Sequence, residues 1–365
     1  MKNQAPDNSI STPWWSWTWP AIGLVLLAAH LIIGPTGLLA VAATFALVTT
    51  VFAAVYHAEV IALRVGEPFG TLMLALAVTI IEVALIVSMM ISGGTETANI
   101  ARDTLFAAVM IVCNGIIGLC LLAGGLRHHE QEFQLRGTNA ALSVLIALTT
   151  LTLVLPNLTT STVGPTFSRP QLTFAAIVSL VLYGAFLFVQ TVRHRDYFLP
   201  LSAGEEEAHV PSPPNKVAVA SGVLLLVCLV VVVALAKTLT PTIEHGIEVV
   251  GAPRSIVGII IAGLVLLPEG LAAYRAATAD RLQTSVNLAL GSVLASIGLT
   301  IPSVALISIL LSKPLTLGLD PKEEILLALT LVVSILTLGT GRTTVLQGTV
   351  HVILFAVFLF LSIAP

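Results

Sequence analysis

The sequence is a series of apolar runs of about 20 residues, divided by short polar gaps. Hydrophobic residues make up 56% of the 365 residues and charged residues only 10%, whereas a soluble domain carries about 25% charged residues. Runs of this length suit helices that pair every backbone group while crossing a bilayer. The strands of an outer-membrane barrel would instead alternate over about ten residues. The predicted fold class is an all-α polytopic membrane protein.

Eleven runs are long enough to span a membrane. They lie at about residues 17–33, 36–58, 69–92, 104–125, 138–156, 171–192, 217–238, 252–275, 284–311, 323–339 and 343–363. Pro302 falls inside the ninth run and is expected to kink or end that helix, because proline removes a backbone hydrogen bond and clashes with the preceding turn. The net charge is only −3, and no basic run indicates a nucleic-acid partner.

The longest polar interval, residues 193–216, lies near the middle of the chain. It contains three glutamates, Glu205 to Glu207, and a proline-rich stretch, Pro211 to Pro214. This composition is typical of a flexible solvated linker, with a cation-sensing or regulatory segment as the alternative. Lys and Arg gather in cytoplasmic loops, and ten of the 16 fall on the side of the N-terminus. The N-terminus and the linker are therefore predicted to be cytoplasmic, and the C-terminus periplasmic, in a bacterial inner membrane.

Two of the apolar runs carry one glutamate near the centre. Glu82 lies within the run 76–90, and Glu269 lies within the run 262–277. A charged side chain at the centre of a bilayer costs roughly 2.5–3.5 kcal/mol on insertion scales and generally marks a functional site. Because the cost is borne twice in related contexts, both carboxylates are predicted to serve one cation and proton site. The alternative for each is a hydrogen bond across a packing interface.

The two glutamate runs belong to an internal repeat. Each follows a Gly-x-Pro sequence, and the glutamates lie 14 residues after Pro68 and 16 residues after Pro253, about 21 and 24 Å along a helix. Both are therefore expected at mid-membrane depth. They fall on the third and eighth runs, and this odd offset reverses the second copy. The pattern predicts two inverted five-helix repeats with a site between them at the midplane.

This symmetry divides the chain into four parts. They are an N-terminal segment with an extra helix (1–35), the first repeat with its glutamate (36–192), the acidic and proline-rich linker (193–216) and the second repeat (217–365). In each repeat the glutamate run is followed by one rich in small and polar residues. The first of these holds Asn114, and the second holds Asn287, Ser292 and Ser296.

The segments around the glutamates resemble a known family. They read Gly66-Glu67-Pro68-Phe69-Gly70-Thr71 and Ile80-Ile81-Glu82-Val83 in the first repeat, and Leu267-Pro268-Glu269-Gly270 and Asn287-Leu288-Ala289-Leu290-Gly291-Ser292 in the second. They are similar to the cation/proton exchanger family of the cation/calcium antiporter superfamily, and within it to the ChaA-type bacterial antiporters for calcium or sodium and potassium. The resemblance covers most of the chain. It implies an ion-coupled antiporter whose two glutamates bind the metal ion and carry the protons.

The resemblance also implies further residues that line the site. In the family's pattern an Asn of the helix after the first glutamate and a Ser of its repeat mate do so, which corresponds to Asn114 and Ser292. Much of the superfamily has Gly-Asn shortly before each glutamate, where this chain has Val78-Thr79 and Val265-Leu266. Of these four residues only Thr79 offers a side-chain oxygen, which leaves room for sodium or potassium, or for a site completed by backbone carbonyls and water.

Several candidate ligands follow from side-chain chemistry. Pro268 lacks a backbone N–H beside the second glutamate, so a helix break there would free a carbonyl for the ion. Asn287 and Ser296 are additional oxygen candidates. The alternative for Asn114 is hydrogen bonding between helices. For Ser292 and Ser296 it is close packing or bonding to their own helix.

The histidines are interpreted as structural residues. His30, His57 and His351 lie in or near ends of apolar runs, and each is expected to be packed or interfacial rather than a proton relay. His128 and His129 precede two glutamates, Glu130 and Glu132, which raises the possibility of a metal cluster. A solvated loop is the favoured interpretation.

The paired carboxylates predict antiport. Together they supply up to four oxygens and two negative charges, which suits one Ca²⁺ ion, monovalent ions or two protons. Because cation and proton compete for the same oxygens, alternating access would exchange cytoplasmic Ca²⁺ and/or Na⁺ and K⁺ for protons. A cation channel, or a transporter not coupled to protons, is the alternative. No catalytic constellation predicts an enzyme. The cations and protons are substrates, and neither a cofactor nor an obligatory protein partner is expected.

Overall fold

The structure is a computed structural model that describes residues 12–34, 36–66, 69–92, 98–199, 212–251, 253 and 255–364. Some predicted features lie outside these residues, namely the three glutamates of the linker, Pro68 and the first eleven residues of the chain.

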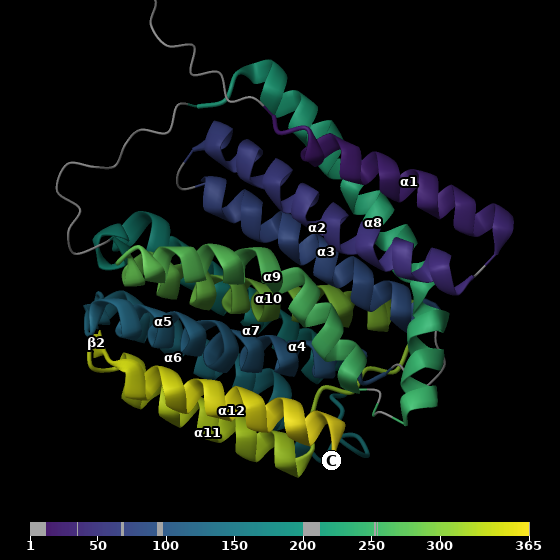
Figure 1. Cartoon of the computed structure of the whole chain (residues 1–365). Coiled ribbons are helices and arrows are strands. Elements are labelled where there is room, and N and C mark those ends of the chain that lie inside the picture. Colours follow the sequence, from purple (N-terminus) through teal and green to yellow (C-terminus); the bar gives the residue numbers. More distant parts are fainter. Residues whose placement is uncertain are drawn as a thin grey trace, which may run out of the picture. The chain divides into compact units, whose positions relative to one another are not determined.

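Long helices make up nearly all of the described chain (Figure 1). In order they are α1 (Trp15–Ile33), α2 (Gly37–Val65), α3 (Phe69–Ser92), α4 (Ile100–Met110) continued by the π-helical η2 (Ile111–Ile116) and α5 (Ile117–His128), α6 (Leu135–Thr149) continued by η3 (Thr150–Val154) and η4 (Leu155–Leu158), α7 (Arg169–Phe188) continued by η5 (Val189–Arg193), the short η6 (Arg195–Phe198), α8 (Asn215–Val250), α9 (Ser255–Thr278), α10 (Leu282–Leu311), α11 (Pro321–Leu338) and α12 (Val345–Ile363). Counting α4, η2 and α5 as one continuous rod gives eleven long helices in these ranges. The predicted all-α class and helix number are confirmed.

Ten of these helices are long and apolar enough to cross a membrane. The helix that falls outside this set is α11, whose 18 residues include Lys322, Glu323 and Glu324 in the first turn. The chain is therefore a multi-span membrane protein.

Two helices continue where the sequence predicts an interruption. The seventh predicted run ends at residue 238, but α8 continues through Pro241 to Val250. Likewise α10 does not end at Pro302 and extends to Leu311. A proline removes one hydrogen bond, but long helices keep enough of the others to continue, and neighbouring groups can satisfy the freed carbonyl.

Local sequence signals account for where several helices begin. Ser168 and Gln171 form a capping box at α7, as Asp320 and Glu323 do at α11. Each pair satisfies backbone N–H groups that have no partner within the helix. Pro170 stands in the first turn of α7, where the missing N–H is tolerated.

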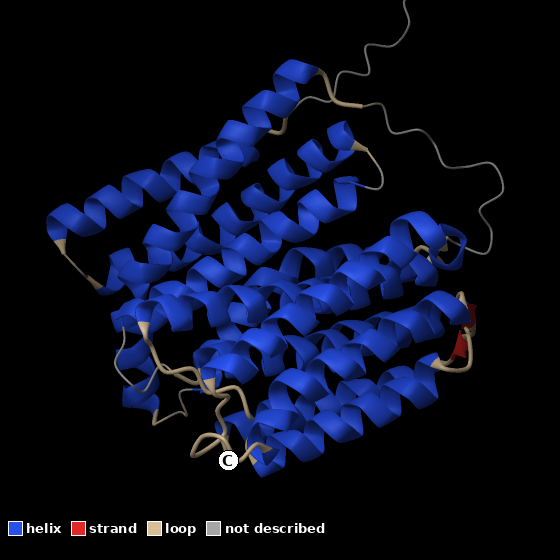
Figure 2. Cartoon of the chain, turned by 180° about the vertical axis from the view of Figure 1, so that it is seen from behind, coloured by secondary structure: helices blue, strands red, loops and turns tan. Residues whose placement is uncertain are grey.

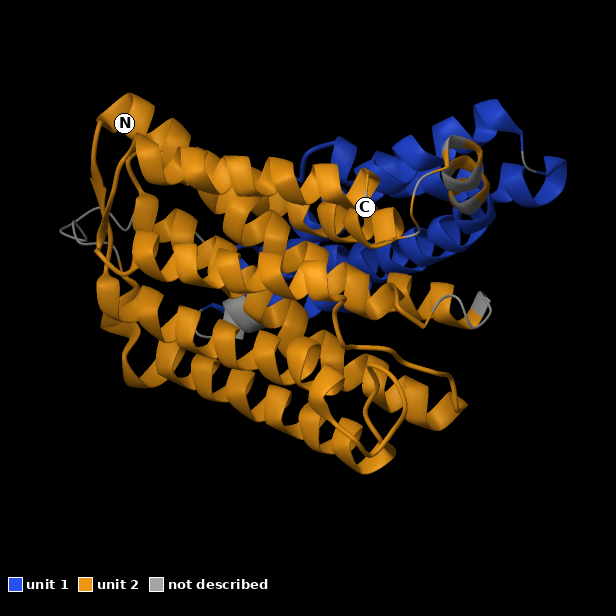
Figure 3. Ribbon diagram, turned by 90° about the horizontal axis from the view of Figure 1, so that it is seen from below, with its two compact units in different colours: residues 1–81, 204–242 blue, residues 82–203, 243–365 orange. Residues whose placement is uncertain are grey.

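The chain forms two compact units, shown in different colours in Figure 3. Residues 1–81 and 204–242 make one, and residues 82–203 and 243–365 make the other. In the first unit, α1 packs closely against α8: a Cβ atom at Gly23 would lie 3.6 Å from Leu235 and would overlap Val231. These units cut across the two predicted repeats, so the division of the chain into repeats stays a prediction.

Within the second unit, α5 and α12 lie side by side (Figure 1). Glycines permit this approach: a Cβ atom at Gly118 would lie 2.9 Å from the Cβ of His351, and one at Gly125 would lie 2.9 Å from the backbone nitrogen of Val345. On the opposite helix, a Cβ at Gly348 would clash with the backbone of Leu122. Small residues facing one another are the usual basis for close helix packing in membranes.

In the second unit, a two-stranded antiparallel ladder links the connection between α5 and α6 to the connection between α11 and α12. Its strands are drawn red in Figure 2. β1 (Gln131–Glu132) pairs with β2 (Arg342–Thr343). Arg342 lies 2.8 Å from Glu132 and 3.7 Å from Glu130. The side-chain amide of Gln131 donates to the carbonyl of Ala277 over 3.1 Å. The segment predicted as a solvated loop is thus held by the strand pairing, while Glu130 and Glu132 are half exposed and pair with Arg342 at the surface.

The glycine contacts predict a matched pair of stabilities. Gly348→Ala should destabilise the protein by about 1–3 kcal/mol, because the added methyl group overpacks against the backbone of Leu122. Gly184→Ala on α7 is the control, because a Cβ atom added there would meet no neighbouring side chain or helix within 4 Å; its free energy of unfolding should stay the same or rise. Thermal unfolding of the detergent-solubilised proteins measures both. Equal unfolding temperatures for the two variants would contradict the packing argument.

Candidate cation-binding site

A hydroxyl from α10 contacts the carboxylate of Glu82 on α3. The Ser296 hydroxyl lies 2.7 Å from Oε1 and 2.7 Å from Oε2 of Glu82, and donates to the carboxylate. Both side chains are only 3% exposed. Two helices far apart in the sequence therefore place a hydroxyl directly on a buried carboxylate.

Burial makes the charge of Glu82 expensive. An ionised carboxylate loses its hydration in an apolar interior, and such groups are normally paired with a cation, hydrogen-bonded or protonated. Within the described residues Glu82 forms no ion pair with Lys, Arg or His. One hydroxyl does not neutralise a full charge. The site is therefore suited to hold a proton or a metal cation against this carboxylate.

Other oxygens lie on the same two helices. Thr79 is buried one turn before Glu82 on α3, and Ser292 is half-buried one turn before Ser296 on α10. Thr300, one turn after Ser296, is fully buried. It faces the Glu82 carboxylate, but its hydroxyl forms no hydrogen bond of normal geometry within the described chain. Thr300 is not among the residues predicted from the sequence, although its i+4 spacing from Ser296 puts both on one helix face.

Glu269 is half-buried on α9. The helix is continuous from Ser255 to Thr278, so the break expected at Pro268 does not occur. Proline still lacks its N–H, which removes the usual hydrogen bond to the carbonyl of Leu264, four residues earlier. The local effect expected of Pro268 therefore concerns one carbonyl and leaves the course of the helix unchanged.

Asn114 faces α11 and α12. It lies in the π-helical turn η2, and its amide nitrogen donates to the hydroxyl of Thr330 over 2.8 Å. Its amide oxygen lies 3.0 Å from Nδ1 of His351. Both polar ends of the side chain are thus used in contacts between helices, the alternative foreseen for this residue. The packed position expected for His351 is also observed, since the ring is 0% exposed.

Asn287 also has partners other than Glu82. Near the beginning of α10, its amide nitrogen donates to the carbonyl of Phe198 over 2.6 Å, and its amide oxygen accepts from the side chain of Gln283 over 2.9 Å. These contacts tie α10 to η6. Of the predicted residues, the structure therefore brings Ser296 onto Glu82, whereas Asn114 and Asn287 are bonded elsewhere.

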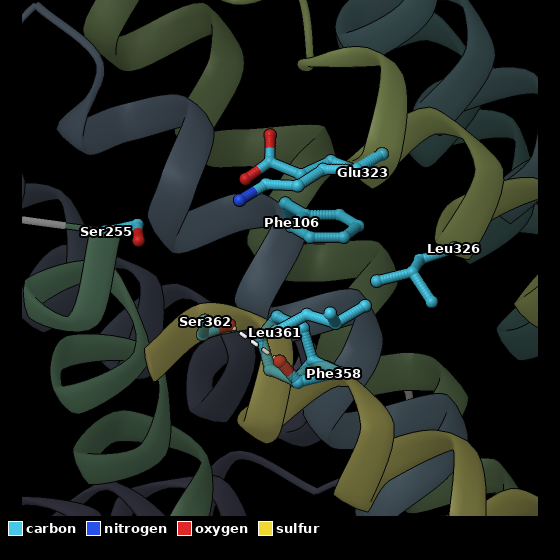
Figure 4. Close-up of a pocket in the computed structure, with 8 residues that line it drawn as sticks. Phe106, Ser255, Glu323, Leu326, Phe358, Leu361 and Ser362 are labelled. Carbon is cyan, nitrogen blue, oxygen red and sulfur yellow. Dashed lines mark hydrogen bonds between the residues drawn. The ribbon is translucent and has the colours of Figure 1, made fainter. Parts of the chain in front are cut away.

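A small cavity in the described part of the chain lies apart from the predicted ligands. Its volume is about 20 Å³, it is lined by Phe106, Glu323 and Phe358 among others (Figure 4), and this volume corresponds to about one water molecule. None of its lining residues is a predicted ligand. In the part of the chain that the structure describes, no group of three or more His, Cys, Asp or Glu side chains is placed to hold a metal ion. Carboxylate and hydroxyl oxygens are the donor set at Glu82.

A polytopic helical protein with a carboxylate buried among hydroxyls inside its apolar helices has the architecture of a membrane cation transporter. The chain belongs to the sodium/calcium exchanger protein family, whose model matches residues 36–192 and 220–364. This membership agrees with the resemblance seen in the sequence. It makes the protein a transporter rather than an enzyme, with cations and protons as substrates rather than cofactors.

Individual relatives cover most or all of the chain. An ionic transporter of Sinorhizobium fredii, y4hA, is 51% identical over 100% of both chains. The sodium-potassium/proton antiporter ChaA of Escherichia coli is 34% identical, over 87% of this chain and 86% of that protein. The crystal structure of the H⁺/Ca²⁺ exchanger CAX is similar in fold, with a TM-score of 0.71 and 17% identity over 94% of this chain and 87% of that chain. YfkE gives a TM-score of 0.72 at 18% identity, over 96% and 100% of the two chains.

The contact between Ser296 and Glu82 predicts a change in cation affinity. Ser296→Ala should raise the cation concentration for half-maximal transport roughly tenfold. The lost hydrogen bond to the ionised carboxylate contributes about 1.5–3 kcal/mol, and its removal favours the protonated form, which competes with the cation. Transport by reconstituted vesicles over a range of cation concentrations measures this. The control is Ser303→Ala on the same helix, because the Ser303 hydroxyl donates to the carbonyl of Leu299 of its own helix over 2.8 Å. An unchanged half-saturation in Ser296→Ala would contradict the assignment.

Proposed function

We propose that this protein is a secondary antiporter that exchanges Ca²⁺ and/or Na⁺ and K⁺ for protons at Glu82 and Glu269. One observation carries the proposal: the carboxylate of Glu82 is buried among apolar helices, and the Ser296 hydroxyl lies 2.7 Å from each of its two oxygens. A carboxylate in this position needs a positive charge. It receives that charge either as a proton or as a metal ion.

Competition for the same oxygens gives exchange without further machinery. A metal ion requires the ionised carboxylate, whereas a proton removes the charge that binds the metal. Ser296 suits both states, because a hydroxyl can donate to a carboxylate and can also offer its lone pairs to a cation. Alternating exposure of the site to the two faces of the membrane then couples the two fluxes.

The relatives support the choice of substrates. The Escherichia coli protein at 34% identity is named for sodium, potassium and proton exchange. The Ca²⁺/H⁺ antiporter ChaA of Bacillus subtilis is 26% identical over 60% of this chain. Both kinds of cation therefore belong in the proposal, and protons are common to both names.

We further propose that Glu269 is the counterpart of Glu82 in an inverted repeat. The proposed halves are residues 36–192 and 217–365, preceded by the extra helix of residues 1–35 and divided by the linker 193–216. Support comes from the family model, whose two matched segments leave out residues 1–35 and 193–219. Thr79, Asn114, Ser292, Asn287 and the carbonyl freed by Pro268 are secondary candidates, and the contacts of Asn114 and Asn287 give them the weakest support.

The proposed location is a bacterial inner membrane. The relatives from Sinorhizobium and Escherichia are bacterial. The bias of Lys and Arg favours a cytoplasmic N-terminus and a periplasmic C-terminus. Antiport of this kind needs only the cations, the protons and the bilayer, so no obligatory protein partner is proposed.

Loss of either carboxylate should abolish exchange. Glu82→Gln and Glu269→Gln each remove the charge that binds the cation and the group that carries the proton, while keeping the size of the side chain. Proton-coupled cation uptake in everted vesicles should fall to the level of empty vesicles. Glu130→Gln is the control, because Glu130 is half exposed and pairs with Arg342 over a long 3.7 Å. Normal exchange by either membrane-inserted variant would rule out the paired-carboxylate mechanism.

One experiment identifies which cations the protein transports. In everted vesicles with an imposed pH gradient, each transported ion should collapse the gradient when Ca²⁺, Na⁺ or K⁺ is added alone. A pH-sensitive dye measures the response at several pH values. Saturation at low turnover and dependence on an opposing pH gradient distinguish an antiporter from a cation channel. Cation flux that neither saturates nor moves protons would support the channel instead.

A further inference from the structure

A second buried polar cluster joins η2 to α11 and α12. His351 lies between two partners, with Nδ1 3.0 Å from Oδ1 of Asn114 and Nε2 3.2 Å from the hydroxyl of Thr337. On its other side, the amide of Asn114 donates to Thr330, whose hydroxyl lies 3.4 Å from the sulfur of Met110. Within the described residues, the hydrogen bonds of these groups go to one another and not to Glu82.

The hydrogen bonds of this cluster have a defined direction. The amide oxygen of Asn114 can only accept, so Nδ1 of His351 carries the hydrogen and donates. Nε2 of the neutral ring then accepts from the hydroxyl of Thr337. When the ring is neutral, each polar group of this cluster has a hydrogen-bond partner, as a stable buried polar network requires. The cluster therefore fixes the orientation of the Asn114 amide.

The turn that carries Asn114 packs against the helix of Glu269. Its two ends, Ile111 and Ile116, face glycines of α9: a Cβ atom at Gly263 would lie 4.0 Å from Ile111, and one at Gly270 would lie 3.0 Å from Ile116. Gly270 directly follows Glu269 in the sequence. One side of the π-helical turn is thus pressed against the carboxylate helix, while Asn114 fastens the turn to α11 and α12.

We infer that His351 is a positioning residue for exchange, which acts through Asn114 to hold η2 against α9 beside Glu269. This inference rests on the proposed function. The imidazole is well placed for the role, because α12 lies so close to α5 that a Cβ at Gly118 would meet the backbone of Val352 at 3.0 Å. Close packing of this helix pair holds the ring in place, and the hydrogen bond from the ring orients the side-chain amide of Asn114. π-Helical turns of this kind occur frequently at functional sites.

Two amide substitutions separate positioning from other roles of His351. In His351→Asn the side-chain nitrogen replaces Nδ1, so the hydrogen bond to Asn114 is kept. In His351→Gln the nitrogen replaces Nε2 and faces Thr337, so the bond to Asn114 is lost. Neither side chain titrates. Cation-dependent proton exchange in vesicles should be within about twofold of wild type for His351→Asn, whereas for His351→Gln the half-saturating cation concentration should rise roughly tenfold.

The outcomes of this comparison are distinct. Equal impairment of both variants would mean that the imidazole itself is required and would overturn the inference, as would normal transport by both. Thr330→Val and Thr337→Val keep the test decisive if His351→Gln does not insert. Loss of Thr330 should mimic His351→Gln because it frees the other end of the same amide, and loss of Thr337 should leave half-saturation near wild type. Absence of exchange by the wild-type protein would instead refute the proposed function.

Discussion

The contact between the Ser296 hydroxyl and the Glu82 carboxylate is the interaction on which the proposed chemistry of this protein depends. A lysine or arginine at the same position would neutralise the carboxylate permanently and leave no demand for a mobile charge. A hydroxyl donates one hydrogen bond yet contributes no charge, so the electrostatic cost of burial remains. That residual cost attracts a cation or a proton, and the neutral partner allows either one to leave. Thr300, on the same face of α10, adds a second neutral oxygen beside the carboxylate.

Glycine contacts position the helices around this site. The rod formed by α4, η2 and α5 meets α9 on one side, where a Cβ at Gly258 would lie 2.7 Å from the backbone of Asp103. On another side it meets α12, through Gly118 and its neighbours. Lipid gives little hydrophobic drive for helices to associate, so close backbone contact supplies much of the attraction. The rod therefore packs between the helix of Glu269 and the helix of His351.

The sequence predicted what depends on local pattern. Apolar length located all eleven helices, and an isolated glutamate in an apolar run marked Glu82, whose contact Ser296 was among the expected residues. Features set by tertiary packing could not be predicted from local pattern. No pattern shows that Asn114 turns toward His351, since the two lie 237 positions apart. The sequence also does not show whether a helix ends at an internal proline: α9 continues through Pro268 and α10 through Pro302, because a long helix keeps its other hydrogen bonds.

The placement of the amides clarifies the donor set of the site. Thr79 occurs where the family resemblance leads one to expect an amide before the first glutamate, and Leu266 occurs before the second. In this conformation Asn114 uses both ends of its side chain on α11 and α12, so its amide oxygen is engaged by the imidazole of His351. Among the described residues, the hydroxyls of Ser296 and Thr300 lie next to the Glu82 carboxylate. A site of carboxylate and hydroxyl oxygens neutralises less charge than one with two bound carboxylates. In the proposed mechanism Glu269 supplies the second carboxylate, and its charge would favour a divalent over a monovalent ion.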